Sequence, residues 1–239
     1  MSPPRAHVGT RSLERLERLE RLRQDRARLA EHYPALRFEI DEMKSTAEAA
    51  GPLLVVLPDG TREPVEVRIE FEPTYPLRPP RPYDAADRWK PEPDRHIEHD
   101  GHLCLFLRGV DAPDLKPDGA ILAFVADLEE FLRQQIVLDS QRKFNPHARF
   151  PGPEWPHGNL AYELFVVRLL QHEPAGVRAA LWDAARHSLN RRSACPCGSG
   201  NGYGDCHFRL SKKLRRSAHE AQLHALNYER LVQDTRDYA

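Results

Sequence analysis

The clearest indication of the fold is the stretch Leu53-Leu-Val-Val-Leu-Pro-Asp-Gly-Thr-Arg-Glu-Pro-Val-Glu-Val-Arg-Ile-Glu-Phe71. Its first five residues form an apolar run typical of a β-strand, and Pro58-Asp59-Gly60 is a turn sequence. Over 65–71 apolar and charged residues alternate, which indicates a strand with one buried and one solvent-exposed face. The stretch therefore predicts an antiparallel hairpin.

The segments on either side of this hairpin predict helices. Residues 11–31 contain neither Gly nor Pro, and leucines recur among Arg and Glu residues. Because the Leu-Glu-Arg triplet drifts around a helix by about 60° per repeat, it indicates a docking helix and not a coiled coil. Apolar residues recur at helical spacing over 121–138, and a further helix is expected over about 160–171.

Proline sets the character of the segment that follows the hairpin. Seven of the 21 prolines lie between Pro73 and Pro93, which excludes a helix or a central strand and predicts a rigid extended crossing. The order of helix, antiparallel strands, proline segment and helices predicts an α+β domain over 11–172. A shift in composition after Glu173-Pro174 separates it from a C-terminal tail over 186–239.

Composition limits the class of protein. The 239 residues carry 35 basic and 36 acidic side chains and are 40% hydrophobic. Every apolar run is far shorter than the roughly 20 residues that span a bilayer, and the first 30 residues lack an apolar signal core. We therefore expect a cytoplasmic protein with no membrane partner and with reduced thiols.

Three of the four cysteines lie within twelve residues, together with a histidine. Cys195, Cys197, Cys206 and His207 supply the four ligands of a closed tetrahedral zinc site. The glycines between them allow the tight turns that such a site requires. A segment this small and rich in glycine cannot bury enough apolar surface to fold alone, which favours zinc as its cofactor.

The same segment resembles a known zinc-binding tail. The SEC-C motif is resembled by Cys195-Pro-Cys-Gly-Ser-Gly200, Tyr203 and the Cys206-His207 pair, although Asn201, Gly202, Gly204 and Asp205 stand where that family usually has lysines. Residues 186–216 carry eight basic side chains and one acidic one. Two interpretations stay open: the knuckle holds two helices together, or it recruits a protein or nucleic acid.

The fourth cysteine, Cys104, stands apart. A lone thiol is more often a small buried hydrophobe than a nucleophile. Here Asp100-Gly101 predicts a turn directly before Cys104, and His96, His99 and His102 bring titratable groups near it. These surroundings favour a reactive thiol. His99 and His102 are expected at the surface, although strand alternation would place His102 on the same side as Cys104.

Residues 11–170 resemble the ubiquitin-conjugating enzymes, most closely their bacterial relatives. The resemblance rests on Tyr75-Pro-Leu-Arg-Pro-Pro80, on Ile97, Gly101 and Leu103 before Cys104, and on Trp155-Pro-His-Gly158. His96 occupies the position of the family's asparagine, and Asp94 and Arg95 replace its His-Pro. The resemblance implies a UBC-like, four-stranded antiparallel meander flanked by helices, with a small C-terminal helical zinc knuckle.

The resemblance also implies an activity. Cys104 would receive a ubiquitin-like protein from an activating enzyme as a thioester and pass it to an amine of an unknown acceptor protein. His96 would stabilise the oxyanion or act as a base, and His157 is a second candidate for orienting the acceptor. The bacterial relatives imply a conjugation operon, often an antiphage defence island, with a JAB-type isopeptidase.

Three alternatives to a transferase stay open. A non-catalytic adaptor would hold a ubiquitin-like protein, and a nucleic-acid adaptor would bind through the zinc tail. A cysteine hydrolase would use Cys104 and His157, but no protease signature surrounds the cysteine.

Overall fold

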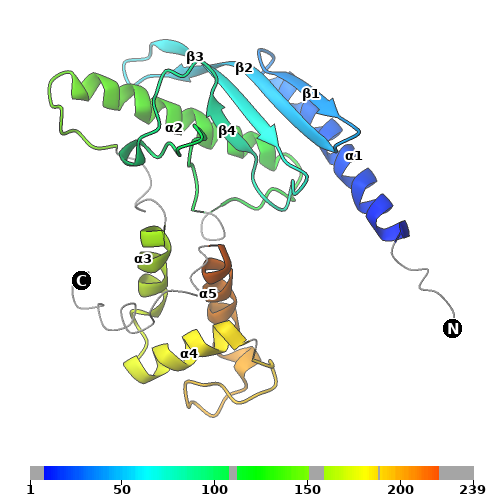
Figure 1. Ribbon diagram of the computed structural model, residues 1–239, viewed down its shortest axis with the longest axis vertical. Coiled ribbons are helices and arrows are strands. Elements are labelled where there is room, and N and C mark those ends of the chain that lie inside the picture. The colour runs from blue at the N-terminus through cyan, green and yellow to red at the C-terminus, as the bar shows by residue number, and fades with distance from the viewer. Residues whose placement is uncertain (1–7, 108–111, 151–158, 188, 221–239) are drawn as a thin grey trace. The chain divides into compact units, whose positions relative to one another are not determined.

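The computed structural model describes residues 8–107, 112–150, 159–187 and 189–220 (Figure 1). The chain separates into two compact units. Unit 1 comprises residues 1–105 and 113–153, and unit 2 comprises residues 106–112 and 154–239. Within the described residues there are a four-stranded antiparallel sheet and five α-helices, so the predicted α+β class is confirmed.

The sheet of unit 1 is a simple antiparallel meander. Its strands β1 (Arg37–Asp41), β2 (Thr46–Val56), β3 (Arg62–Phe71) and β4 (Arg81–Asp84) lie side by side in chain order (Figure 1). The predicted hairpin is confirmed as β2 and β3, whose turn is closed by a 2.9 Å hydrogen bond from the Gly60 N–H to the Leu57 carbonyl.

The register of β2 and β3 places apolar residues on one face. Leu53 pairs with Val65, and Ala49 pairs with Ile69, and all four side chains are buried. Residues between them point to the other face, which is largely solvent-exposed along both strands. The predicted alternation of a buried and an exposed face therefore holds.

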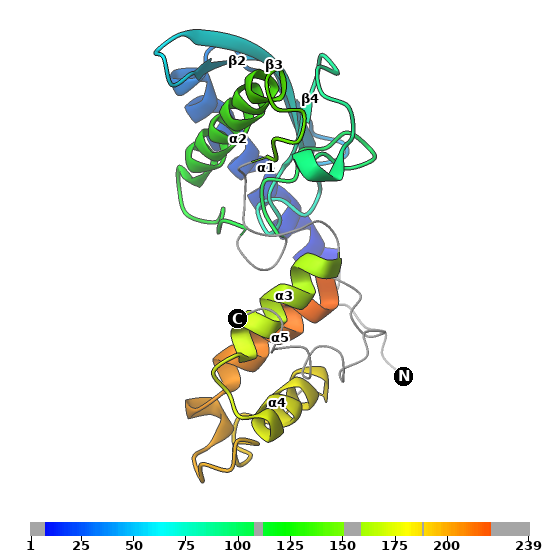
Figure 2. The ribbon, with the colours of Figure 1, turned by 90° about the vertical axis from the view of Figure 1, so that its left-hand side faces the viewer.

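Two helices cover the buried face of the sheet. Helices α1 (Val8–His32) and α2 (Ala120–Arg142) both lie on this side (Figure 2). Helix α2 buries a continuous apolar stripe that includes Ile121, Val125, Leu128, Leu132 and Ile136. In α1 the leucines of the Leu-Glu-Arg repeat turn away from the core along the helix, as expected: Leu19 and Leu22 are buried, whereas Leu16 is 59% exposed.

The proline-rich segment contributes an edge strand. β4 contains Pro82 and pairs with β3 alone among the named strands, as expected for a strand whose proline cannot donate to a ladder. On its far side the Pro82 carbonyl accepts a 2.8 Å hydrogen bond from the Leu103 N–H, and Tyr83 forms a β-bridge with His102. The cysteine-bearing segment is thereby joined to the sheet.

A buried charged cluster fixes the proline-rich segment to α1. The Tyr75 hydroxyl donates a 2.5 Å hydrogen bond to Oδ2 of Asp25, whose side chain is fully buried. Arg21 Nε donates to the same oxygen at 2.7 Å, and its terminal nitrogens donate to the carbonyls of residues 115–117. Burial first, and then the Asp25 charge, raise the pKa of Tyr75, so its hydroxyl stays protonated and can donate.

Unit 2 is helical in its described part. Helices α3 (Asn159–Leu170), α4 (Ala175–His187) and α5 (Phe208–Glu220) share a core to which Val166, Leu181, Trp182 and Leu214 contribute. Helix α3 falls within the predicted domain over 11–172, but it packs against α4 and α5. The described part of α5 ends at Glu220. Among the described helices, none has the length and apolar character needed to cross a membrane.

Candidate functional site

The candidate metal centre is built by tight turns between α4 and α5. The Cys195 N–H donates a 2.9 Å hydrogen bond to the Asn201 carbonyl, which closes the loop between them. Gly198 and Gly200 have φ values of 76° and 78°, a left-handed conformation that glycine adopts without strain. A 3-10 turn over Tyr203–Asp205 then leads to Cys206 and His207 directly before α5.

Four donor atoms converge in this loop. The ligand atoms of Cys195, Cys197, Cys206 and His207 all lie within 4.8 Å of one another. The Sγ atoms of Cys197 and Cys206 are 3.6 Å apart, and His207 Nδ1 lies 3.2 Å from Cys195 Sγ and 3.1 Å from Cys206 Sγ. A tetrahedral ion with metal–sulfur bonds of about 2.3 Å places two sulfurs roughly 3.8 Å apart. The donor set therefore fits a metal ion.

The two leading cysteines differ in their acidity. The Ser199 hydroxyl lies 3.2 Å from Cys197 Sγ, and this hydrogen bond lowers the pKa of Cys197 to about 6. Burial raises the pKa of Cys195. Since only the thiolate binds a metal, the hydrogen bonds at Cys197 favour the metal-binding form of that residue, whereas burial opposes it at Cys195.

Comparison with known families agrees with this geometry. Residues 191–209 match the family model of the SEC-C motif. This segment carries an SEC-C motif. The predicted SEC-C resemblance is thus confirmed, and the four predicted ligands form a cluster that could hold a metal ion, while the resemblance of unit 1 to ubiquitin-conjugating enzymes stays a prediction. A search of curated proteins found no match.

One residue outside the SEC-C motif reaches the cluster. Glu173 Oε1, in the connection between α3 and α4, lies 3.1 Å from Nε2 of His207. Glu173 is not predictable from the sequence, because no spacing rule connects residues 34 positions apart in the chain.

The second candidate site is the hairpin that carries Cys104. Ile97 and Leu103 form an antiparallel bridge and are both buried. One residue further along each arm, the Cys104 N–H donates a 2.8 Å hydrogen bond to the His96 carbonyl. Cys104 is partly exposed, and His96 has a left-handed backbone with φ of 56°. The two sequence-predicted residues are thus neighbours.

Arg95 anchors this hairpin to α2. Its guanidinium donates to Asp139 Oδ1 at 2.7 Å and to Gln135 Oε1 at 3.2 Å, while Gln135 Nε2 donates to the Arg95 carbonyl at 2.6 Å. Glu92 accepts from Arg95 at 3.1 Å and from Arg142 at 2.9 and 3.0 Å. Hydrogen bonding by Arg142 lowers the pKa of Glu92. Arg95 therefore holds the segment in place.

Packing on the other side of His96 also involves α2. The His96 ring centroid lies 5.5 Å from that of Phe150, which in turn lies 5.1 Å from Phe131 of α2. The imidazole is therefore positioned by an aromatic side chain as well as by its backbone.

The remaining histidines have different environments. His99 is exposed, as expected. The side chain of His102 is only 17% exposed, in contrast to the expected surface position, and its Nδ1 lies 2.8 Å from Asp100 Oδ1 and 3.2 Å from Arg81. Burial lowers the pKa of His102 although Asp100 opposes this effect. His157 and the Trp155–Gly158 segment lie outside the described residues.

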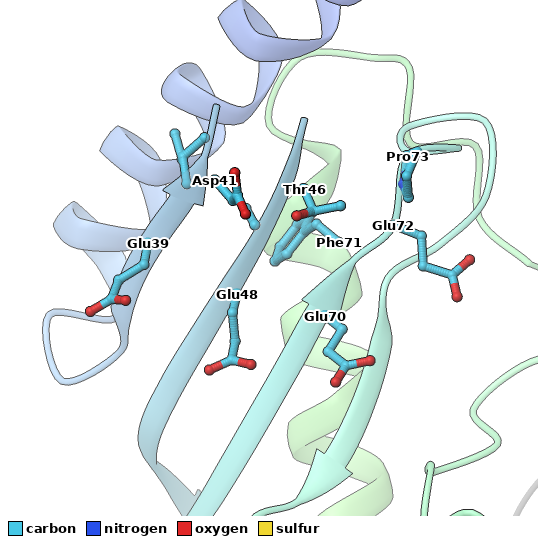
Figure 3. A pocket seen from close by; sticks show the side chains of 10 residues that line it. Glu39, Asp41, Thr46, Glu48, Glu70, Phe71, Glu72 and Pro73 are labelled. Atoms are coloured by element: carbon cyan, nitrogen blue, oxygen red, sulfur yellow. The ribbon is translucent and has the colours of Figure 1, made fainter. Parts of the chain in front are cut away.

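A third feature is a shallow hollow of about 510 Å³ at the exposed face of the sheet. Figure 3 shows carboxylates around it, contributed by Glu39, Asp41, Glu48, Glu70 and Glu72. Arg68 forms an ion pair with Glu70 and so balances part of this charge. The lining includes no residue of the cysteine hairpin or the metal centre.

Proposed function

We propose that unit 1 is an acyl-transfer enzyme of the ubiquitin-conjugating type, in which Cys104 carries the C-terminal glycine of a ubiquitin-like protein as a thioester. The observation that carries this proposal is the 2.8 Å backbone hydrogen bond that makes Cys104 and His96 neighbours on an anchored hairpin, where Cys104 is partly exposed. The left-handed conformation of His96 adds support, because strained backbone often occurs at functional sites. The order of α1, four antiparallel strands, hairpin and α2 agrees with the architecture that the resemblance implies.

The chemistry has two steps. The Cys104 thiolate attacks the carbonyl carbon of the thioester on the activating enzyme; a new C–S bond forms, and the activating enzyme's thiolate leaves. An amine of the acceptor then attacks the Cys104 thioester; a C–N bond forms, Cys104 leaves as thiolate, and the amine proton passes to a base. Each step develops an oxyanion, which His96 stabilises as a donor, or His96 takes the proton.

The proposed partners follow from this chemistry. They are a ubiquitin-like protein, an activating enzyme and an acceptor protein with an accessible amine. By resemblance to bacterial relatives, the operon would also encode a JAB-type isopeptidase and would serve antiphage defence.

For the SEC-C cluster we propose zinc, bound as a closed structural site. Three thiolates and one imidazole at tetrahedral spacing match its preferred ligand set and leave no open position for catalysis. The ion would connect the loop after α4 to the start of α5.

Thioester formation tests the enzymatic proposal. The full chain is incubated with ATP and with the ubiquitin-like protein and activating enzyme encoded beside it, and a nonreducing gel is examined for a thiol-sensitive adduct. Cys104→Ala should abolish the adduct. His96→Ala should load but discharge about 10²- to 10³-fold more slowly. His99→Ala, a change to an exposed histidine of the same hairpin, is the matched control and should behave as the wild type.

A basic surface favours an adaptor as the second candidate. Exposed basic side chains lie within the SEC-C segment at Arg191, Arg192 and Arg209 and directly after it at Lys212 and Lys213. An adaptor of this kind would bind nucleic acid with an affinity that falls steeply as salt rises, and it would keep this binding in Cys104→Ala. An affinity for nucleic acid that does not depend on salt, together with ATP-dependent loading of Cys104, would instead support the transferase.

A further inference from the structure

We propose that Glu173 belongs to the metal centre, as the carboxylate that orients His207 for binding through Nδ1. The imidazole of His207 has two nitrogens with different neighbours. Nδ1 faces the sulfurs of Cys195 and Cys206 at 3.2 and 3.1 Å, whereas Nε2 faces Glu173 Oε1 at 3.1 Å. A neutral imidazole has one N–H and one lone pair. With the N–H at Nε2 donating to Glu173, the lone pair of Nδ1 points at the thiol cluster.

The contact is sheltered from solvent. The side chains of His207 and Glu173 are 19% and 24% exposed, in contrast to surface pairs such as His187 and Asp183 at 66% and 69%. A hydrogen bond to a metal-binding histidine from a carboxylate fixes its tautomer and ring orientation and makes it a better ligand. Glu173 therefore meets the requirements of an outer-shell ligand partner.

The backbone around Glu173 is also held. Its N–H donates a 2.9 Å hydrogen bond to the Leu170 carbonyl at the end of α3, and its carbonyl accepts a 2.6 Å hydrogen bond from Arg178 Nε in α4. Because Glu173 lies outside residues 191–209, the metal centre extends beyond the SEC-C motif. Metal binding is thereby coupled to the connection between α3 and α4, and not only to the loop that carries the ligands.

Metal affinity of the full chain tests the proposal. Zinc affinity is measured by competition with a chromophoric chelator for the wild type, Glu173→Gln and Glu173→Ala. Loss of such a partner typically weakens metal binding by about 10- to 100-fold, which we expect for Glu173→Ala, with Glu173→Gln in between because its amide oxygen can still accept. Asp183→Asn, which removes the charge from a surface His–carboxylate pair, is the matched control and should leave the affinity unchanged.

A second measurement uses the wild-type chain and does not depend on the folding of a variant. With ¹¹³Cd²⁺ bound and ¹⁵N-labelled histidine, NMR should show coupling of the metal to Nδ1 of His207 and a proton on Nε2. Coupling to Nε2 would overturn the proposal. The proposal would also be overturned by a Glu173→Ala variant that binds zinc with an affinity within twofold of wild type. This holds even if the metal-free variant is less stable, because the contact would then stabilise only the packing of the helices.

Discussion

Replacing Tyr75 by Phe removes one atom from the buried cluster that joins the proline-rich segment to α1. The lost hydroxyl donates at 2.5 Å to Asp25 Oδ2, and no other described hydroxyl makes this bond. Asp25 is fully buried, and its Oδ1 has no hydrogen-bond partner among the described residues, so the carboxylate has no spare contact that can compensate. Arg21 alone would then hold Oδ2.

The cost follows from the charge of the acceptor. A hydrogen bond to a charged group contributes about 1.5–3 kcal/mol to stability, and we expect the Tyr75→Phe variant to lose a free energy of unfolding in this range. For a unit of this size that corresponds to a fall in Tm of about 3–12 °C. Tyr33→Phe is the matched control: its hydroxyl is 3.4 Å from Glu129 Oε2, and its loss should cost under about 0.5 kcal/mol.

The assay must report on unit 1 alone. Urea-dependent hydrogen exchange, read by mass spectrometry on peptides from α1 and β3, meets this need, because global signals would mix the two units. Equal stabilities of the Tyr75→Phe and Tyr33→Phe variants would refute the reasoning that the buried carboxylate depends on Tyr75.

Three further outcomes are expected. Gly51→Ala should lower the free energy of unfolding by about 2–4 kcal/mol, which would be measured as a lower urea midpoint. The reason is that φ of Gly51 is 141° and a Cβ there would lie 2.3 Å from the Ala35 carbonyl oxygen. An unchanged midpoint would contradict this close approach. Adding EDTA to the zinc-loaded chain should remove exchange protection from peptides of α4 and α5 while leaving α2 protected, and equal loss in both units would argue against a local structural metal. Lowering the pH from 7 to 5 should reduce the free energy of unfolding. Burial lowers the pKa of His102 in the folded state below its unfolded value of about 6.5, so the unfolded chain binds the proton more readily. His102→Gln should therefore reduce the dependence of the free energy of unfolding on pH.

The features that the sequence predicts best are those with a local pattern. Alternation over 65–71 predicted the inner face of β3, and helical spacing over 121–138 predicted the buried stripe of α2. The SEC-C cluster is predictable for the same reason, because all four ligands lie within 13 consecutive residues, 195–207.

Features that depend on long-range contacts were not predictable in this way. The buried Asp25 looks in sequence like any charged residue of a solvated helix face, and only the fold brings Tyr75 to it. Glu173 meets His207 across the chain, and Arg95 meets Asp139 on α2. Likewise, the apolar spacing of α3 predicts a helix but does not say which core receives it, and its partners are α4 and α5.

The proposed acyl transfer by Cys104 is tested by intact-protein mass spectrometry of the full chain after incubation with ATP, the activating enzyme and the ubiquitin-like protein. We predict a mass increase equal to one ubiquitin-like protein minus water, mapped to Cys104 and reversed by added thiol. An adduct that persists in Cys104→Ala, or an unmodified chain when the activating enzyme is itself loaded, would contradict the account.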